Sequence, residues 1–318
     1  MTVAVGLGLM EYPFETVAAY WRWVDMCEAG GVDSFWQTDR VVSREPILEC
    51  MTAIAAVAGR TKRMKFGMNV VSLALRDPIL VAKQCATIDV LSEGRLLPAF
   101  GVGSPQAPEW KALGLDTKSR GSKTDEGLEI ISRLWREDSV DFTGRHYKLT
   151  GASLSPKPVQ PDLPMWIGGN SEAAIERTAK VGTGWQAGPE TPAQAGVVVA
   201  AIKAAAARHG RSIDDDHYGA GFPFYFGRPD DPVLARVMAA YQKRTGREPL
   251  GYFAVGGADE LVQRIAEYVE NGVSKFVIRP VGRGDEAMLA QTRRLIDEVL
   301  PVVARRWPKP VKAQTTRA

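Results

Sequence analysis

The sequence predicts an α/β fold of the (β/α)8 TIM-barrel class, and three observations support this prediction. Short apolar runs alternate with longer amphipathic runs along the chain, as strands and helices do in a parallel α/β fold. Eight such pairs are present, and each connection is long enough for a right-handed crossover. The length of 318 residues suits one barrel that carries insertions. A doubly wound open sheet is the alternative, but the number of repeats favours closure.

The first half of the chain supplies four strands. Gly30 and Gly31 end the first helix, and Pro78 lies in the first turn of the third, where its missing N–H is not needed. The expected strands are 3–9, 33–38, 64–71 and 95–102, and the expected helices are 14–29, 46–59 and 76–91.

Two insertions interrupt the alternation in the second half, at about 105–164 and 228–256. The first holds an irregular stretch over 105–120, a helix capped by Ser122 or Thr124, a hairpin over 140–149 and a proline-rich connector. The second has the composition of a helix. The remaining strands are expected at 165–167, 184–187, 217–226 and 275–278, and the remaining helices at 172–181, 192–209, 259–270 and 285–306. Residues 1–308 should therefore form a single domain, and the polar residues 309–318 a flexible C-terminal tail.

Composition excludes several classes of function. Net charge is only +3 without a long basic block, which argues against a nucleic-acid partner. No apolar run approaches the ~20 residues that span a bilayer, and no basic region precedes the first apolar stretch, so we expect a cytoplasmic protein. The three cysteines lack CxxC spacing, and none of the three histidines falls where barrel chemistry occurs, so a metal site is not expected.

In a barrel, chemistry takes place where strands run into the following helices. The residues at these positions lack a carboxylate pair, a metal cluster and a nucleophile beside a base; they are Leu9, Met10, Thr38, Asp39, Arg40, Asn69, Val70, Ser72, Gly103, Ser104, Gly168, Gly169, Asn170, Ser171, Trp185, Gln186, Phe224, Phe226, Arg279 and Pro280. Asp39 and Arg40 are the charged pair nearest to this rim. They are our candidate catalytic residues. The alternative is that the two charges only form salt bridges that hold the start of a loop.

Residues 166–171 have the pattern of a phosphate cradle. A short strand ends in Gly168 and Gly169, and a helix opens after Asn170 and Ser171. The first turn of a helix has unpaired N–H groups and a positive dipole end, and glycines let an anion approach that backbone closely. A plain turn with Asn or Ser as the N-cap is the alternative. A cradle in a site with few charges suggests a cofactor that brings its own reactivity.

Taken together, these stretches resemble the bacterial-luciferase-like superfamily of flavin- and deazaflavin-dependent oxidoreductases over nearly the whole chain. The residues that carry the resemblance are 31–39, 66–70 with 75–78, 86–95 leading to 101–103, 144–147 with 156–159, 166–171 with 182–185, and 271–280. Each motif is weak by itself, but six in the same order and spacing are specific.

The resemblance implies a TIM barrel with an insertion lid, usually as a homodimer, and a reduced flavin-type cofactor lying over the strand ends. It implies that the cofactor phosphate binds Gly168, Gly169, Asn170 and Ser171, with Gly103 and Ser104 nearby. It also implies a non-proline cis peptide behind the cofactor ring, and the matching bond joins Asn69 to Val70.

The chain departs from one branch of the superfamily. Members that use the deazaflavin coenzyme F420 often carry Asp-His where this chain has Asp39 and Arg40, and some carry Glu where it has Ser104. Arg40 could instead hold an anionic substrate or balance a reduced flavin. These departures argue against a copy of the sugar-phosphate dehydrogenase chemistry, without excluding F420.

We therefore expect a flavin-dependent monooxygenase that takes reduced FMN from a separate reductase and acts with O2 on a small organic substrate. Its expected pocket residues are Trp36, Trp185, Phe224, Phe226 and Arg279, with the insertion closing over them. The first alternative is F420-dependent hydride transfer, served by an F420 reductase. A second is a non-catalytic flavin-binding protein, and a third is an unrelated phosphate-binding barrel, which would need a Lys or Glu base at a strand end.

Overall fold

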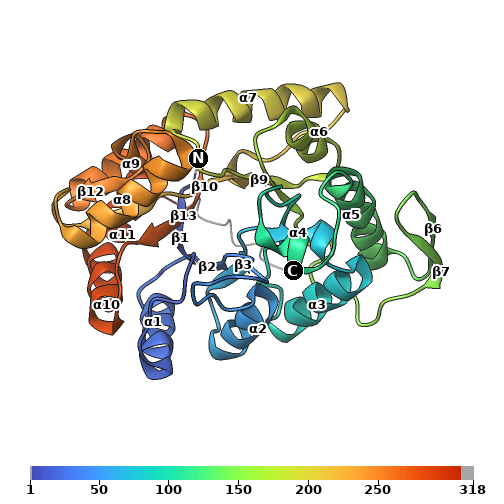
Figure 1. The fold of residues 1–318 in the computed structure, drawn as a ribbon, viewed down its shortest axis with the longest axis horizontal. Helices are drawn as coiled ribbons and strands as arrows, with labels where there is room; N and C mark the ends of the chain where they lie inside the picture. The colour runs from blue at the N-terminus through green and yellow to red at the C-terminus, as the bar shows by residue number, and fades with distance from the viewer. Residues whose placement is uncertain (1, 309–318) are drawn as a thin grey trace, which may run out of the picture.

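The computed structural model describes residues 2–308, and eight parallel strand positions form the predicted barrel (Figure 1). The expected tail, 309–318, lies outside the described residues. Each strand pairs in parallel with the next one around the ring. In ring order the strands are β1 (Ala4–Leu9), β2 (Ser34–Gln37), β3 (Lys65–Met68) with β4 (Val71–Ser72), β5 (Ala99–Gly101), β8 (Trp166–Gly168), β9 (Gly184–Gln186), β10 (Tyr218–Ala220) with β11 (Pro223–Phe226), and β13 (Lys275–Pro280).

Two of the predicted strands, 64–71 and 217–226, are each divided into two. β3 pairs with β2 whereas β4 pairs with β5, so the third strand changes its partner along its length and thereby closes the ring. An isolated parallel β-bridge between Phe66 and Leu96 also joins the third strand to the segment that leads into β5. In the seventh strand, β10 pairs with the start of β13 and β11 with its end.

An outer ring of helices surrounds the strands (Figure 1). These helices are α1 (Val17–Ala29), α2 (Cys50–Arg60), α3 (Pro78–Leu91), α5 (Arg120–Arg136), α6 (Glu172–Val181), α7 (Pro192–Arg208), α9 (Ala258–Glu270), α10 (Asp285–Arg294) and α11 (Leu300–Arg306). The last two belong to the single helix predicted over 285–306, which contains a π-helical turn at Leu295–Val299.

Three predicted helix starts are wrong. The helix α1 begins at Val17 rather than at 14, because the Thr16 hydroxyl caps it by accepting from the N–H of Ala19 at 3.1 Å. The helix α2 begins at Cys50 rather than near 46, because the Glu49 side chain caps it by accepting from the N–H groups of Met51 and Thr52. The helix α5 begins at Arg120, before either predicted cap; the turn that leads into it is held by Asp116, and Thr124 is buried within the helix.

The two insertions differ in their relation to the barrel. The first contains the short helix α4 (Pro108–Ala112), within a stretch predicted to be irregular, and the expected hairpin, β6 (Val140–Thr143) with β7 (Lys148–Ala152), which projects from the body (Figure 1). The second contains α8 (Pro232–Thr245) and an unpredicted strand, β12 (Ala254–Gly256), which pairs in parallel with β11. The second insertion is thus anchored to the barrel sheet directly above the seventh strand.

Two separate apolar cores hold the barrel together. The larger packs the outer faces of the strands against the helices. The smaller fills the barrel itself and consists of Trp36, Ala99, Trp166 and Val277, with Val70 and Leu97 against it. Because the interior is filled, any ligand must bind above this layer, at the carboxyl ends of the strands. No helix within residues 2–308 combines the length and the apolar character needed to cross a membrane.

Candidate functional site

A cavity of about 360 Å³ lies at the carboxyl ends of the barrel strands. Side chains alternate between the two faces of a strand, so each strand sends the residue at its end either inward to this cavity or outward to the helices. The lining residues are Met10, Thr38, Asn69, Val70, Gly168, Gly169, Gln186, Ala187, Gly188, Pro189, Arg244, Tyr252 and Arg279. Five of the predicted site residues are therefore brought together here: Asn69, Val70, Gly168, Gly169 and Arg279.

The glycine cradle forms one wall of the cavity. Gly169 has φ +115°, a backbone conformation that favours glycine. Its carbonyl accepts a hydrogen bond from Trp185 Nε1 at 2.7 Å, which fixes the turn. Ser171 is the N-cap of α6, since its hydroxyl accepts from the N–H of Ala174 at 3.3 Å. The structure thus shows the N-cap interpretation for Ser171, while Gly168 and Gly169 line the cavity and their role in binding a phosphate stays a prediction.

A buried carboxyl group stands behind the cradle. Asn170 Nδ2 donates to Glu190 Oε1 at 2.6 Å, and Glu190 Oε2 has no hydrogen-bond partner among the described residues. Burial raises the pKa of Glu190, although the nearby backbone N–H groups of Glu190 and Gly188, the Asn170 amide and the charge of Arg247 act in the opposite direction. The loop that carries Glu190 is fixed further by Arg247 Nη1, which donates to the Pro189 carbonyl at 2.9 Å.

The peptide bond between Asn69 and Val70 is cis, as the resemblance implied. Val70 packs between two glycines of neighbouring strands. A Cβ added at Gly101 would lie 2.8 Å from Val70 Cγ2, and one added at Gly168 would lie 3.1 Å from the same atom. Both glycines therefore make room for Val70, which forms part of the cavity floor.

Gly103 and Ser104 do not line the cavity. Gly103 has φ +73°, and a Cβ there would lie 3.1 Å from Ser72 Oγ. The Ser104 carbonyl accepts from Trp110 Nε1 at 2.7 Å, so this turn is fastened to α4. A role of these two residues in cofactor binding stays a prediction.

Asp39 and Arg40 have different partners rather than each other. The Asp39 carboxylate is buried, accepting from Arg76 Nη2 at 2.6 Å and from the N–H of Ser72 at 2.9 Å. Arg40 reaches instead to the buried Glu109, with 3.3 Å between Nη1 and Oε2. Both contacts fasten loops, which is the alternative that the sequence left open for this pair.

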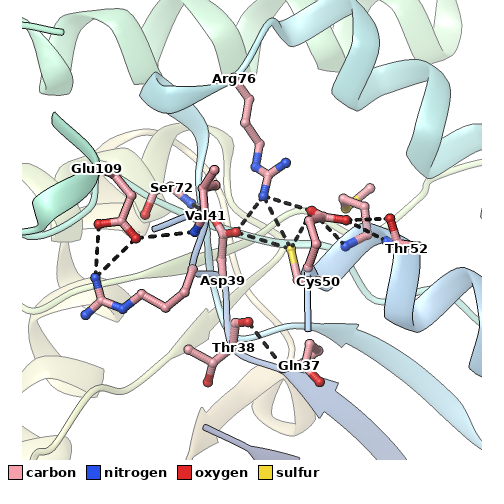
Figure 2. Close-up of polar contacts among 12 residues, drawn as sticks. Gln37, Thr38, Asp39, Val41, Cys50, Thr52, Ser72, Arg76 and Glu109 are labelled. Carbon is pink, nitrogen blue, oxygen red and sulfur yellow. Dashed lines mark hydrogen bonds and ion pairs between the residues drawn. The ribbon is translucent and has the colours of Figure 1, made fainter. Parts of the chain in front are cut away.

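Asp39 lies in a cluster of charged and ionisable side chains. Asp39, Glu49 and Cys50 converge closely enough to ligate a metal ion, but the Arg76 guanidinium lies among them and supplies the positive charge (Figure 2). Burial by itself would lower the pKa of Arg76, but Asp39 raises it above the ordinary value. Burial and the Asp39 charge together raise the pKa of the Cys50 thiol. The cluster is thus a closed ion-pair network that holds the end of β2 to β4.

The four aromatic residues predicted for the substrate pocket lie elsewhere. Trp36 belongs to the core inside the barrel, where its ring packs 6.3 Å from that of Trp166. Trp185 points to the outer face of β9 and braces Gly169. Phe224 and Phe226 also face outward; the guanidinium of Arg294, on α10, lies 4.4 Å from the Phe226 ring centre. These residues are at strand ends but on the wrong face, or one layer too deep, so the prediction is corrected.

Arg279 is the predicted pocket residue that does reach the cavity. Its Nη2 donates to the Tyr252 hydroxyl at 2.6 Å, and that hydroxyl donates to the Gly221 carbonyl at 2.7 Å. Tyr252 and Arg244 come from the second insertion, where the sequence carries no recognisable motif. Met10, Thr38 and Gln186 were at predicted strand ends and could have been selected by the alternation of side chains along each strand.

The cavity has the features required of a site for a flat cofactor that bears a phosphate. The backbone of Gly168 and Gly169 is open to it where the positive end of α6 begins. Gln186 lines the cavity, and both amide atoms of its side chain are buried without a partner among the described residues. Val70 offers an apolar surface beside them.

Comparisons with known proteins agree with this geometry. The model of a family described as luciferase-like monooxygenase matches residues 2–250. An uncharacterised protein of Mycobacterium tuberculosis is 32% identical over 160 residues, which are 50% of this chain and 54% of that protein, about half its length. The F420-dependent glucose-6-phosphate dehydrogenase of Amycolatopsis mediterranei is 26% identical over 86% of this chain and 91% of its own. The crystal structure of the monooxygenase RslO1 from Streptomyces bottropensis shares the fold, with a TM-score of 0.81 at 18% identity over 94% of this chain and 99% of its own.

Proposed function

Because the family model matches residues 2–250 of 318, the chain belongs to the luciferase-like monooxygenase family, and on this premise we propose that it is a flavin-dependent oxidoreductase. More specifically, we propose a monooxygenase that uses reduced FMN and O2 on a small organic substrate. The observation that carries the proposal is the cavity at the strand ends, where the glycine backbone at the start of α6 and the Val70 surface meet and no acid–base pair among residues 2–308 lines the cavity. Such a site supplies binding and orientation, and its reactivity must come from a cofactor.

Different residues of the cavity would bind different parts of the cofactor. Gly168, Gly169 and the N-terminus of α6 would hold the phosphate. Asn69, Val70 and Gln186 would face the ring system. When bound, reduced flavin supplies the electrons and the reaction with O2. The chain would orient the flavin, and the apolar side chains of Val70 and Ala187 would keep water from the place where it reacts.

F420-dependent hydride transfer is the second candidate, and one observation favours it. The F420-dependent dehydrogenase named above matches this chain at 26% identity over 86% of its length. Against it, Arg40 stands where members of that branch often carry His, and Ser104 where some carry Glu; in this structure Arg40 is paired with Glu109. We therefore place FMN first.

The dependence of product formation on O2 distinguishes the FMN-dependent monooxygenase from F420-dependent hydride transfer. The full chain is supplied with FMN reduced by a separate reductase, or with reduced F420, and a panel of small carboxylates, sulfonates and neutral analogues is screened in air and under strict anaerobiosis. We expect product only with FMN in air. Product under anaerobiosis with F420 would replace the monooxygenase proposal by hydride transfer. Tight cofactor binding without turnover under either condition would instead support the non-catalytic alternative.

A further inference from the structure

The charge of the cavity lining points to the kind of substrate that it takes. Two lining residues carry a full charge, Arg244 and Arg279, and both are positive. No aspartate or glutamate lines the cavity within the part of the chain that the structure describes. Two other arginines with little exposure are neutralised by a carboxylate, Arg76 by Asp39 at 2.6 Å and Arg177 by Asp125 at 2.5 Å. Neither arginine of the cavity forms an ion pair with a described residue.

Arg279 is held in place without being neutralised. It reaches inward from the end of β13 and is half-buried. Its Nη2 donates to the Tyr252 hydroxyl, while its Nε is buried and has no partner among the described residues. The Tyr252 proton is committed to the Gly221 carbonyl, so Tyr252 acts towards Arg279 as a neutral acceptor that fixes the orientation of the guanidinium. A partly buried cation with an unused donor is costly unless an anion completes it.

Arg244 brings a second free cation to the mouth of the same cavity. It lies in the last turn of α8, is exposed, and forms no ion pair with any described residue. Gln186 lines the same cavity and is only 2% exposed, and neither its Nε2 nor its Oε1 has a partner within the described part of the chain. A buried amide with unused donors and acceptors is an independent sign of a polar ligand, because such groups are otherwise hydrogen-bonded.

We propose that the substrate carries an oxyanion, a carboxylate, sulfonate or phosphate group, which Arg279 and Arg244 bind from two sides while Gln186 meets the polar part next to it. The guanidinium groups present planar sets of donors that suit such groups. This inference rests on the proposed function, because it assigns the glycine cradle to the cofactor phosphate and the two arginines to the substrate.

The test measures anion preference on the full chain saturated with FMN. Isothermal titration compares benzoate with benzamide, and hexanesulfonate with hexan-1-ol, which differ in charge more than in size. We expect the two anions to bind and the neutral partners to bind at least about tenfold more weakly, because hydrogen bonds to a charged group are stronger than those between neutral groups. Arg279→Gln and Arg244→Gln should each remove most of that preference.

Matched controls separate this site from general charge effects. Arg236→Gln makes the same charge change on the exposed side of the same helix, outside the cavity lining, and should leave benzoate affinity unchanged. Tyr252→Phe retains the charge of Arg279 but removes its orienting acceptor, and should weaken benzoate less than Arg279→Gln does. Equal binding of benzoate and benzamide to the wild-type chain would overturn the inference.

A second titration, of the cofactor-free chain with FMN and with F420, keeps the two proposals apart. Unchanged cofactor affinity in Arg279→Gln and Arg244→Gln supports the substrate role. A loss of cofactor affinity as large as the loss of benzoate affinity assigns the arginines to the cofactor phosphate and overturns it. If the wild-type chain binds neither cofactor, the proposed function fails. The inference about the substrate is then tested by titrating the cofactor-free chain with benzoate and benzamide. A preference for benzoate that is lost in both arginine variants supports the inference, and any other result overturns it.

Discussion

Glu190 links the protonation state of the protein to the geometry of the cradle. Its carboxyl group accepts from Asn170, which belongs to the cradle, and burial holds its pKa above the ordinary value. The neighbouring groups are Arg247, whose charge lowers this pKa, and Tyr268, whose hydroxyl donates to the Glu190 carbonyl. A carboxyl group whose pKa is raised by folding binds its proton more tightly in the folded state than in the unfolded chain.

The raised pKa of Glu190 determines how the stability of the protein changes with pH. The contribution of Glu190 to stability is fully present below its unfolded pKa of about 4.5 and is lost as the pH rises through the raised folded pKa. Glu190→Gln keeps the acceptor for Asn170 but cannot ionise. We expect the variant to match the wild type near pH 4.5 and to have a progressively higher melting temperature than the wild type as the pH rises to 8. Thermal denaturation across that range measures the difference, and Glu286→Gln, whose side chain is 87% exposed, is the control. Parallel curves for wild type and Glu190→Gln would contradict this account.

Arg76 stabilises the rim rather than the chemistry. It is the positive partner of the buried Asp39, whose side chain is 1% exposed. Arg76→Met would leave that carboxylate buried without its counter-charge, so we expect the free energy of unfolding to fall by about 3–5 kcal/mol. Urea denaturation measures the loss. Arg60→Met removes the same charge from an exposed pair with Asp25 and should cost much less. Equal losses for the two variants would mean that the buried network is not structural.

At the scale of elements, the strands of the barrel were predictable from alternating apolar runs, and all eight were found. The cradle was predictable as well, because glycines before a helix start mark it within a few residues. The residues that line the pocket were not predictable in the same way. The predicted ones were chosen because they are large and aromatic, and not according to which face of the strand they lie on. Along β9, Gly184 and Gln186 face inward and Trp185 faces outward, so the smaller, polar residue reaches the cavity.

The second insertion could not be placed from sequence for a different reason. Its strand β12 has three residues, too few to show a period, and it forms only because the edge of β11 is available to pair with it. Tyr252 and Arg244 reach the cavity through this tertiary arrangement. Residues contributed by an insertion depend on how the insertion docks, and no local pattern encodes that.

The helix α8 is attached to the barrel by few contacts and is therefore expected to move. Its buried residues are Leu234 and Tyr241. The Tyr241 ring stacks on that of Tyr252, with 5.2 Å between centres and 15° between planes. Tyr252 in turn orients Arg279, so α8, Tyr252 and the cavity are mechanically connected.

Tyr241→Ala should release this helix. Loss of a buried aromatic side chain costs about 3–5 kcal/mol, which we expect to appear mainly as local opening. Hydrogen exchange should become faster in residues 232–245, and benzoate affinity should fall, while the strands of the barrel keep their protection. Val237→Ala, on the more exposed side of α8, is the control. Equal acceleration of exchange throughout the barrel strands would contradict a local lid.

At the scale of the whole molecule, the barrel brings together groups that are distant in the sequence. Its filled interior forces ligands to the strand ends, where the cradle, Val70 and Arg279 arrive from three different strands. The family match and the fold agree on this architecture, and the central claim is that the cradle binds a flavin-type phosphate.

Native mass spectrometry of the full chain titrated with FMN and with F420 tests that claim most directly. Gly169→Ala and Gly169→Asp share the backbone penalty of a side chain at φ +115° and a Cβ that would lie 3.1 Å from Ala174 Cβ, but only the aspartate adds a negative charge at the start of α6. We predict one cofactor bound per wild-type chain, FMN in preference to F420, with binding retained at reduced affinity in Gly169→Ala and abolished in a folded Gly169→Asp. Binding of neither cofactor to the wild-type chain, or equal affinity in the alanine and aspartate variants, would contradict it.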